Sequence, residues 1–86
     1  MRIESIHISP SIAHKMLSKH GVRANDVCAA LREGHPAFWR RGKETYLAIG
    51  KTHQYLTIIF RYRNRTAEIR TAYRSSGWQK QLYERR

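Results

Sequence analysis

The sequence predicts a small α+β domain with the element order β-α-α-β-β-β-β-α. Apolar residues recur at helical spacing as far as residue 34, and from Pro36 onward the spacing changes to two. Short turn-forming segments separate the later strands, as in an antiparallel β-meander. We expect a single domain over residues 1–86, with two N-terminal helices and a short C-terminal helix on one face. The other face would then be open to a ligand.

The first third of the chain predicts one strand and two helices. Residues 2–8 alternate loosely and fit a short strand. Ser9-Pro10 begins a helix, because serine caps free N–H groups and proline fits the first turn, and Gly21 suits its left-handed end. A second helix is expected to begin at Asn25-Asp26 and to end at Gly34. The side chains expected to face the core are Ile12, Ala13, Met16 and Leu17, followed by Val27, Ala30 and Leu31.

The remainder predicts four consecutive strands and a final helix. The strands are expected at residues 37–40, 45–50, 55–62 and 66–73. The turns between them are Gly42-Lys43, Lys51 to Gln54, and Arg63-Asn64-Arg65, where asparagine tolerates the positive φ of a hairpin. Ser75 or Ser76 then caps a short helix carrying Trp78, Leu82 and Tyr83. The two aromatic residues can either pin that helix to the sheet or, like Trp39, stack on bases.

The charge of the chain points to a polyanionic partner. Seventeen Lys and Arg residues oppose six Asp and Glu, a formal net charge of +11. An acidic protein could use the same surface. A membrane surface is disfavoured, because the basic residues are spread over strands rather than along one amphipathic helix. With neither an apolar leader nor a span of ~20 apolar residues, we expect a cytoplasmic protein.

Cysteine and histidine usage predicts neither a metal nor a cofactor. Cys28 is the only cysteine, so it cannot form an internal disulfide, and we expect a buried thiol in the second helix. The histidines show no spacing typical of a zinc site.

The last predicted hairpin brings basic residues together. If its turn centres on Asn64-Arg65, Phe60 lies opposite Ile69, Arg61 opposite Glu68, and Arg70 opposite Ile59. Arg61, Glu68 and Arg70 then share a face. An ordinary cross-strand salt bridge between Arg61 and Glu68 is one interpretation. Arg70 has a stronger claim to bind phosphate, because only Glu68 would neutralise the cations around it, which are Lys51, Arg61, Arg63 and Arg74.

Two further residues could transfer protons. His20 stands at the end of the first helix, where it can act as acid or base or simply cap the last carbonyls. Tyr73 ends its strand, and strict alternation places it with Thr71 and Ile69 on the core side. It reaches the open face only if the strand twists or bulges; otherwise it is a core residue.

Three segments resemble the BrnT-type toxins of bacterial toxin–antitoxin systems, within the wider RelE-like ribonucleases. They are Lys19-His20-Gly21-Val22, Leu47-Ala48-Ile49-Gly50-Lys51-Thr52 and Ile69-Arg70-Thr71-Ala72-Tyr73. The resemblance implies a RelE-like fold and a metal-independent endoribonuclease whose basic face is covered by a cognate antitoxin protein. BrnT-type sequences commonly have arginine where this chain has Tyr73.

The chemistry that the resemblance implies is attack by the ribose 2′-oxygen on the adjacent phosphorus, leaving a 2′,3′-cyclic phosphate. The expected catalytic residues are His20, Arg61, Arg70 and Tyr73, with Glu68 as a reserve base. The expected RNA-binding residues are Lys19, Lys51, Arg63, Thr71 and Arg74. The alternative is a basic module that binds RNA or the ribosome without cleaving. A DNA-binding regulator is disfavoured, since neither early helix carries a row of base-reading side chains.

Overall fold

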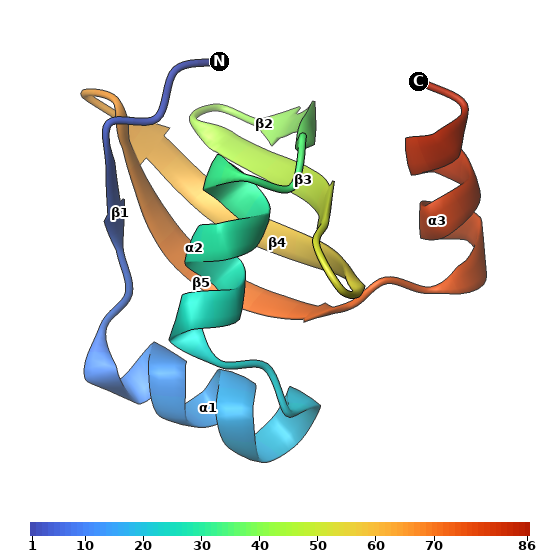
Figure 1. The fold of residues 1–86 in the computed structure, drawn as a ribbon. Coiled ribbons are helices and arrows are strands. Elements are labelled where there is room, and N and C mark those ends of the chain that lie inside the picture. Colours follow the sequence, from blue (N-terminus) through green and yellow to red (C-terminus); the bar gives the residue numbers. More distant parts are fainter.

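The computed structural model describes all 86 residues and contains one five-stranded sheet with three helices (Figure 1). The elements are β1 (Ser5–His7), α1 (Pro10–His20), α2 (Ala24–Arg32), β2 (Ala37–Gly42), β3 (Thr45–Lys51), β4 (Tyr55–Arg63), β5 (Thr66–Arg74) and α3 (Gly77–Glu84). The strand order is β1-β5-β4-β3-β2. The predicted α+β class, element order and antiparallel meander are confirmed. The sheet is nevertheless mixed, because β1 pairs in parallel with β5.

The ends of α1 follow the predicted signals. The Ser9 side chain accepts a hydrogen bond of 3.3 Å from the Ile12 N–H group, and Gly21 closes the helix at φ 66°. Met16 is buried, but Leu17 is 51% exposed, so the expectation that Leu17 faces the core is wrong. The helix packs mainly against β5, and Met16 is its one buried residue.

Helix α2 crosses the sheet at close range. It begins at Ala24, one residue before the predicted start, and the Asp26 carboxylate accepts a 3.0 Å hydrogen bond from the Arg23 N–H group. A β-carbon built at Gly50 would lie only 2.6 Å from the Ala30 carbonyl oxygen, and the same is true at Gly34. The helix and β3 can therefore approach each other only because these two positions lack side chains.

The core lies between the sheet and the two helices α1 and α2, which cover the same face in Figure 1. All three core residues predicted for α2 are buried. Cys28 is only half-buried, contrary to the expected buried thiol, because it lies beside rather than on the stripe that faces the sheet. The buried cluster consists of Met16, Val22, Val27, Ala30, Leu31, Ala48, Leu56, Ile58, Phe60, Ala67, Ile69 and Ala72.

A β-bulge in β5 changes which side chains face the core. Phe60 pairs with Ile69 and Arg61 with Glu68, as predicted. The register then shifts, so Ile59 lies opposite Thr71 and not opposite Arg70, which corrects that prediction. Arg70 is the extra residue. Beyond the bulge, Ala72 joins the core and Tyr73 turns to the opposite face.

The hairpin between β4 and β5 turns where the sequence predicts. Asn64 and Arg65 adopt positive φ angles of 50° and 60°. Such a pair is typical of the tight turns that match the right-handed twist of two strands.

Helix α3 does not share the face of α1 and α2, contrary to prediction. It lies beyond one end of the sheet in Figure 1, and Gln79 contacts Thr57 on the face opposite the core. Tyr83 pins the helix as expected, since its hydroxyl lies 3.0 Å from the carbonyl oxygens of both Gly34 and His35. Trp78 does not pin it, because it remains 63% exposed. None of the three helices has both the length and the apolar character required to cross a membrane.

Replacing Gly50 with alanine should lower the free energy of unfolding by about 1–3 kcal/mol, because overpacking forces the backbone apart. The new β-carbon would lie 2.6 Å from the Ala30 carbonyl oxygen, and relieving that contact moves α2 as a whole. Urea unfolding followed by circular dichroism measures the change. Gly42→Ala is the matched control, since a β-carbon there meets no atom within 4 Å. Equal stability of the two variants would contradict the close approach.

Candidate functional site

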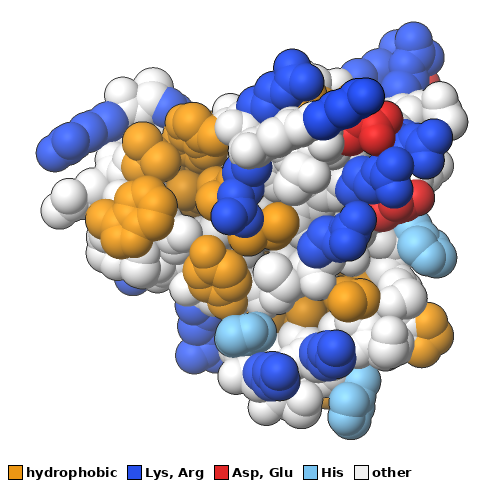
Figure 2. Space-filling view, turned by 180° about the vertical axis from the view of Figure 1, so that it is seen from behind, with side chains coloured by type: hydrophobic (Ala, Val, Ile, Leu, Met, Phe, Trp, Pro, Cys, Tyr) orange, Lys and Arg blue, Asp and Glu red, His pale blue; other side chains and the backbone are white.

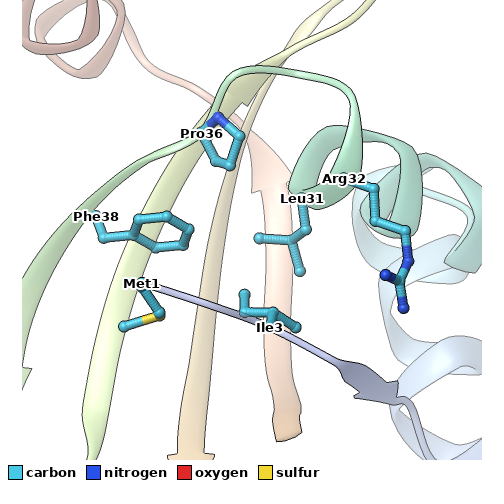
Figure 3. Close-up of a pocket in the computed structure, with 6 residues that line it drawn as sticks. All are labelled: Met1, Ile3, Leu31, Arg32, Pro36 and Phe38. Carbon is cyan, nitrogen blue, oxygen red and sulfur yellow. The ribbon is translucent and has the colours of Figure 1, made fainter. Parts of the chain in front are cut away.

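The main hollow in the surface is lined mostly by hydrophobic residues and holds no side chain suited to acid–base catalysis. It has a volume of about 520 Å³ and opens between the N-terminal segment, the end of α2 and β2 (Figure 3). Arg32 is the one charged side chain at its edge, and the other lining residues are Met1, Ile3, Leu31, Pro36 and Phe38. None of the residues predicted to act in catalysis or RNA binding lines this hollow.

The opposite face of the sheet carries the basic side chains. Figure 2 views the molecule from behind, so it shows the face that α1 and α2 leave uncovered. Lys and Arg side chains are spread over much of this face, and the few acidic ones lie toward the end that holds the β4–β5 turn. Some histidines lie toward the other end, and another lies directly beside an acidic side chain. The face is therefore basic overall but unevenly neutralised.

His20 and Tyr73 meet at that second end of the sheet. Their ring centroids are 5.9 Å apart, with the rings tilted by 48°. The neighbouring strand β1 pairs only with residues 66–68 of β5, so the later part of β5 is a free edge against which α1 ends. Because the bulge turns Tyr73 away from the core, His20 can reach it across this edge. The structure thus brings together two predicted catalytic residues that are far apart in sequence.

Two arginines of β5 lie on either side of Tyr73 along the strand. The Arg74 guanidinium donates a 3.1 Å hydrogen bond to the Gln54 side chain, and one of its nitrogens would lie 3.9 Å from a β-carbon at Gly21. Arg74 therefore lies beside the end of α1, next to His20. Arg70, at the bulge, is exposed and belongs to no salt bridge. Thr71 follows it, half-buried on the Tyr73 side.

Arg61 and Arg63 lie apart from His20 and Tyr73. Although Arg61 is opposite Glu68 in register, its guanidinium binds Glu44 at 3.1 Å, and Arg63 binds the same carboxylate at 3.5 Å. The expected salt bridge between Arg61 and Glu68 is therefore absent. Tyr73 pairs with Thr57, and Arg61 is four residues further along β4, roughly 13 Å at ~3.3 Å per residue.

The two predicted lysines take different positions. Lys19 is exposed and precedes His20 at the end of α1. Lys51 lies over the Tyr55 ring, with its ammonium nitrogen 4.7 Å from the ring centre. The hydrogen bond to Tyr55, together with the charge of that phenol, raises the pKa of Lys51 above its usual value of 10.5. Lys51 therefore remains positively charged throughout the neutral pH range. It is the last residue of β3.

Gln79 and Thr57 form a buried polar group that contacts Tyr73, and no sequence pattern predicts this group. The Gln79 amide nitrogen donates a 3.1 Å hydrogen bond to the Tyr73 hydroxyl, and the amide oxygen lies 3.0 Å from the Thr57 hydroxyl. A threonine in an apolar strand and a glutamine in a short helix carry no motif. Their only sequence signal is Ser76 followed three residues later by Gln79, which is typical of a capping box.

The side chains of this chain form no cluster of three or more His, Cys, Asp or Glu residues that could hold a metal ion. The predicted site residues are instead cations, one histidine, a hydroxyl and a phenol. Such groups suit an anionic ligand whose own oxygen atoms react.

Comparison with known proteins identifies the fold. No family model and no curated protein sequence matches this chain. Among solved structures, that of the ribonuclease toxin BrnT of Brucella abortus superimposes with a TM-score of 0.69 at 16% sequence identity. The match covers 84% of this chain and 96% of the BrnT chain. The expected BrnT-type fold is thus confirmed, and the chain folds as this ribonuclease toxin does.

Proposed function

We propose that this protein is the toxin component of a toxin–antitoxin system and acts as a metal-independent endoribonuclease. The observation that carries the proposal is the contact between His20 and Tyr73, whose ring centroids lie 5.9 Å apart where α1 ends against the free edge of β5. Its setting, the fold of a ribonuclease toxin, supports the same conclusion. A histidine and a tyrosine beside unpaired arginines provide what RNA cleavage requires.

RNA supplies its own nucleophile, so the protein needs only a base, an acid and cations. In the proposed reaction, His20 removes the proton of a ribose 2′-hydroxyl, and that oxygen forms a bond to the adjacent phosphorus. The bond from phosphorus to the 5′-oxygen breaks, and Tyr73 donates its proton to that oxygen. The products are a 2′,3′-cyclic phosphate and a free 5′-hydroxyl. DNA, which lacks the 2′-hydroxyl, is not cleaved.

Cations next to the pair stabilise the charge that develops on the phosphate. We assign this role to Arg70 and Arg74, because both lie on the part of β5 that carries Tyr73. Arginine suits the task since its planar fork can hold two phosphate oxygens at once. We assign Arg61, which is already paired with Glu44, to the path of the RNA backbone instead.

The remaining predicted residues extend this path. Lys19 flanks His20, Thr71 lies between the two site arginines, and Arg63 continues the basic face toward the hairpin turn. Lys51 adds a permanent positive charge on the β3 side. A cognate antitoxin that covers this face would block RNA by occupying the same cations, and we expect its contacting segment to be acidic.

Cleavage of total RNA in excess EDTA tests the proposal directly. We expect fragments that end in cyclic phosphate, and a loss of about 100-fold or more in His20→Ala and in Tyr73→Phe, because each removes one proton-transfer group. RNA binding should be nearly unchanged in both. His53→Ala and Tyr46→Phe are the matched controls, as His53 is an exposed turn residue and the Tyr46 hydroxyl has no hydrogen-bond partner within the protein.

If RNA is retained by the protein yet stays intact, also in the presence of translating ribosomes, the ribonuclease is refuted. The basic module that binds RNA or the ribosome would then be the better description.

A pair of arginine variants tests the division of roles on the basic face. Arg70→Ala should slow cleavage at saturating RNA by about 100-fold, the usual cost of removing a group that stabilises the transition state. Arg61→Ala should change the rate by no more than about fivefold, since an exposed pair contributes at most about 1 kcal/mol. Single-turnover kinetics measures both rates. Equal losses would contradict the placement of Arg61 outside the reacting centre.

Trp78 offers an exposed aromatic surface on the helix that contacts Tyr73. It is 63% exposed and directly precedes Gln79, the residue that contacts Tyr73. Trp78→Ala should weaken binding of single-stranded RNA by about 1–3 kcal/mol through loss of base stacking, and Trp78→Phe should retain most of the affinity. Filter binding measures this. Unchanged affinity in Trp78→Ala would exclude the stacking role.

A further inference from the structure

A group of buried polar side chains contacts Tyr73 and takes no direct part in the proposed reaction. Thr57 is fully buried, Gln79 is 3% exposed and Ser75 is 7% exposed. Buried polar groups are costly unless hydrogen-bonded, and here every buried side-chain polar atom has a partner. The three residues come from β4, from α3 and from the segment between β5 and α3, so the group also joins these elements.

The orientation of the Gln79 amide follows from its neighbours. The backbone N–H group of Ser76, which can only donate, lies 2.9 Å from one amide atom of Gln79. That atom must be the oxygen, because the amide nitrogen has no acceptor capacity. The nitrogen therefore faces Tyr73, 3.1 Å from its hydroxyl. Since the nitrogen only donates, the Tyr73 oxygen must accept this hydrogen bond.

The other hydroxyls are directed in the same way. Thr57 has one hydroxyl proton and donates it to the Gln79 oxygen at 3.0 Å. The Ser75 hydroxyl lies 2.7 Å from that of Thr57, so Ser75 is the donor of this second bond. Donation therefore runs from Ser75 to Thr57, from Thr57 to Gln79, and from Gln79 to Tyr73. The hydroxyl proton of Tyr73 has no acceptor within the protein and is therefore available for transfer to a ligand.

We propose that Gln79 is a positioning residue which holds Tyr73 as a proton donor toward the 5′-oxygen of bound RNA. The inference rests on the proposed ribonuclease function. By donating to the phenol oxygen, Gln79 keeps the Tyr73 proton out of the protein interior. The same hydrogen bond stabilises the negative oxygen that remains once the proton has been transferred. Tyr73 performs the chemistry, and Gln79 acts only through it.

Gln79→Glu is the sharpest variant, because it keeps the shape of the side chain and both of its donors, Ser76 and Thr57. A carboxylate cannot donate, so Tyr73 must turn its proton inward to bind it. We expect the single-turnover rate at saturating protein to fall by about 100-fold or more, as in Tyr73→Phe. Saturation separates this loss from any weakening of RNA binding by the added negative charge. A rate within a few-fold of wild type overturns the proposal.

A structural control and a modified substrate separate positioning from general damage to the fold. Thr57→Val removes a buried hydroxyl from the same group but leaves Gln79 bound to Ser76 and Tyr73, so it should lower stability and retain the rate.

RNA with sulfur in place of the 5′-oxygen releases a thiolate, which leaves without being protonated. Gln79→Glu and Tyr73→Phe should both cleave that RNA at nearly the wild-type rate. Failure of Gln79→Glu on both substrates would mean a distorted site and would overturn the proposal.

Resonance Raman spectra of the free protein test the hydrogen bond without RNA. The tyrosine doublet reports whether a phenol donates or accepts, and subtracting the Tyr73→Phe spectrum isolates Tyr73. We expect the Tyr73 signal to change from acceptor to donor in Gln79→Glu. An unchanged signal overturns the inference even if RNA is cleaved. If the signal changes but the wild-type protein does not cleave RNA, the proposed ribonuclease function fails while the orientation of Tyr73 stands.

Discussion

The candidate site depends on the β-bulge at Arg70. Without the extra residue, strict alternation in β5 would direct Tyr73 into the core, where its ring could not contact His20 and its hydroxyl could not accept from Gln79. The bulge is compatible with the core, because Ile69 before it and Ala72 after it are both buried. The inserted residue thus has two effects. It keeps the apolar side chains of β5 on the core face, and it brings Arg70 and Tyr73 to the opposite face.

The distribution of carboxylates divides the basic face into two ends. Glu44 binds Arg61 and Arg63, and Glu4 binds Arg65, so the cations near the β4–β5 turn are largely neutralised. The arginines near Tyr73 have no such partners. An unpaired cluster of like charges opposes folding, whereas a bound phosphate would relieve the repulsion. The end with the unpaired cations is also the end that holds the histidine and the phenol.

Helix α3 links stability to the site. Tyr83 fastens it to the loop after α2, and Gln79 fastens it to β4 while touching Tyr73. A short helix of this kind would be marginal alone and depends on such packing. Because the same contacts order the donors behind Tyr73, a change that loosens α3 would disturb the site even though the helix carries none of the proposed proton-transfer groups.

Local signals were sufficient for much of the fold. Ser9-Pro10, Gly21 and Asn64-Arg65 act through bonds and dihedral angles within a few residues, and the structure confirms what each predicts. Where β1 pairs, where α3 packs and where β5 bulges could not be predicted, because each depends on contacts between distant segments. The same limit applies to the site: Arg61 binds Glu44 rather than Glu68, and no sequence pattern predicts the contact of Gln79 with Tyr73.

The sequence by itself determined the class of fold, the order of elements, the turn between β4 and β5 and the strongly basic character, since these follow from composition, spacing and local conformation. Only the tertiary structure decided which basic residues stay unpaired, that His20 meets Tyr73, and that a buried amide directs the Tyr73 hydroxyl. Those features arise where α1, β5 and α3 converge, and convergence is a property of packing that no local stretch of sequence contains.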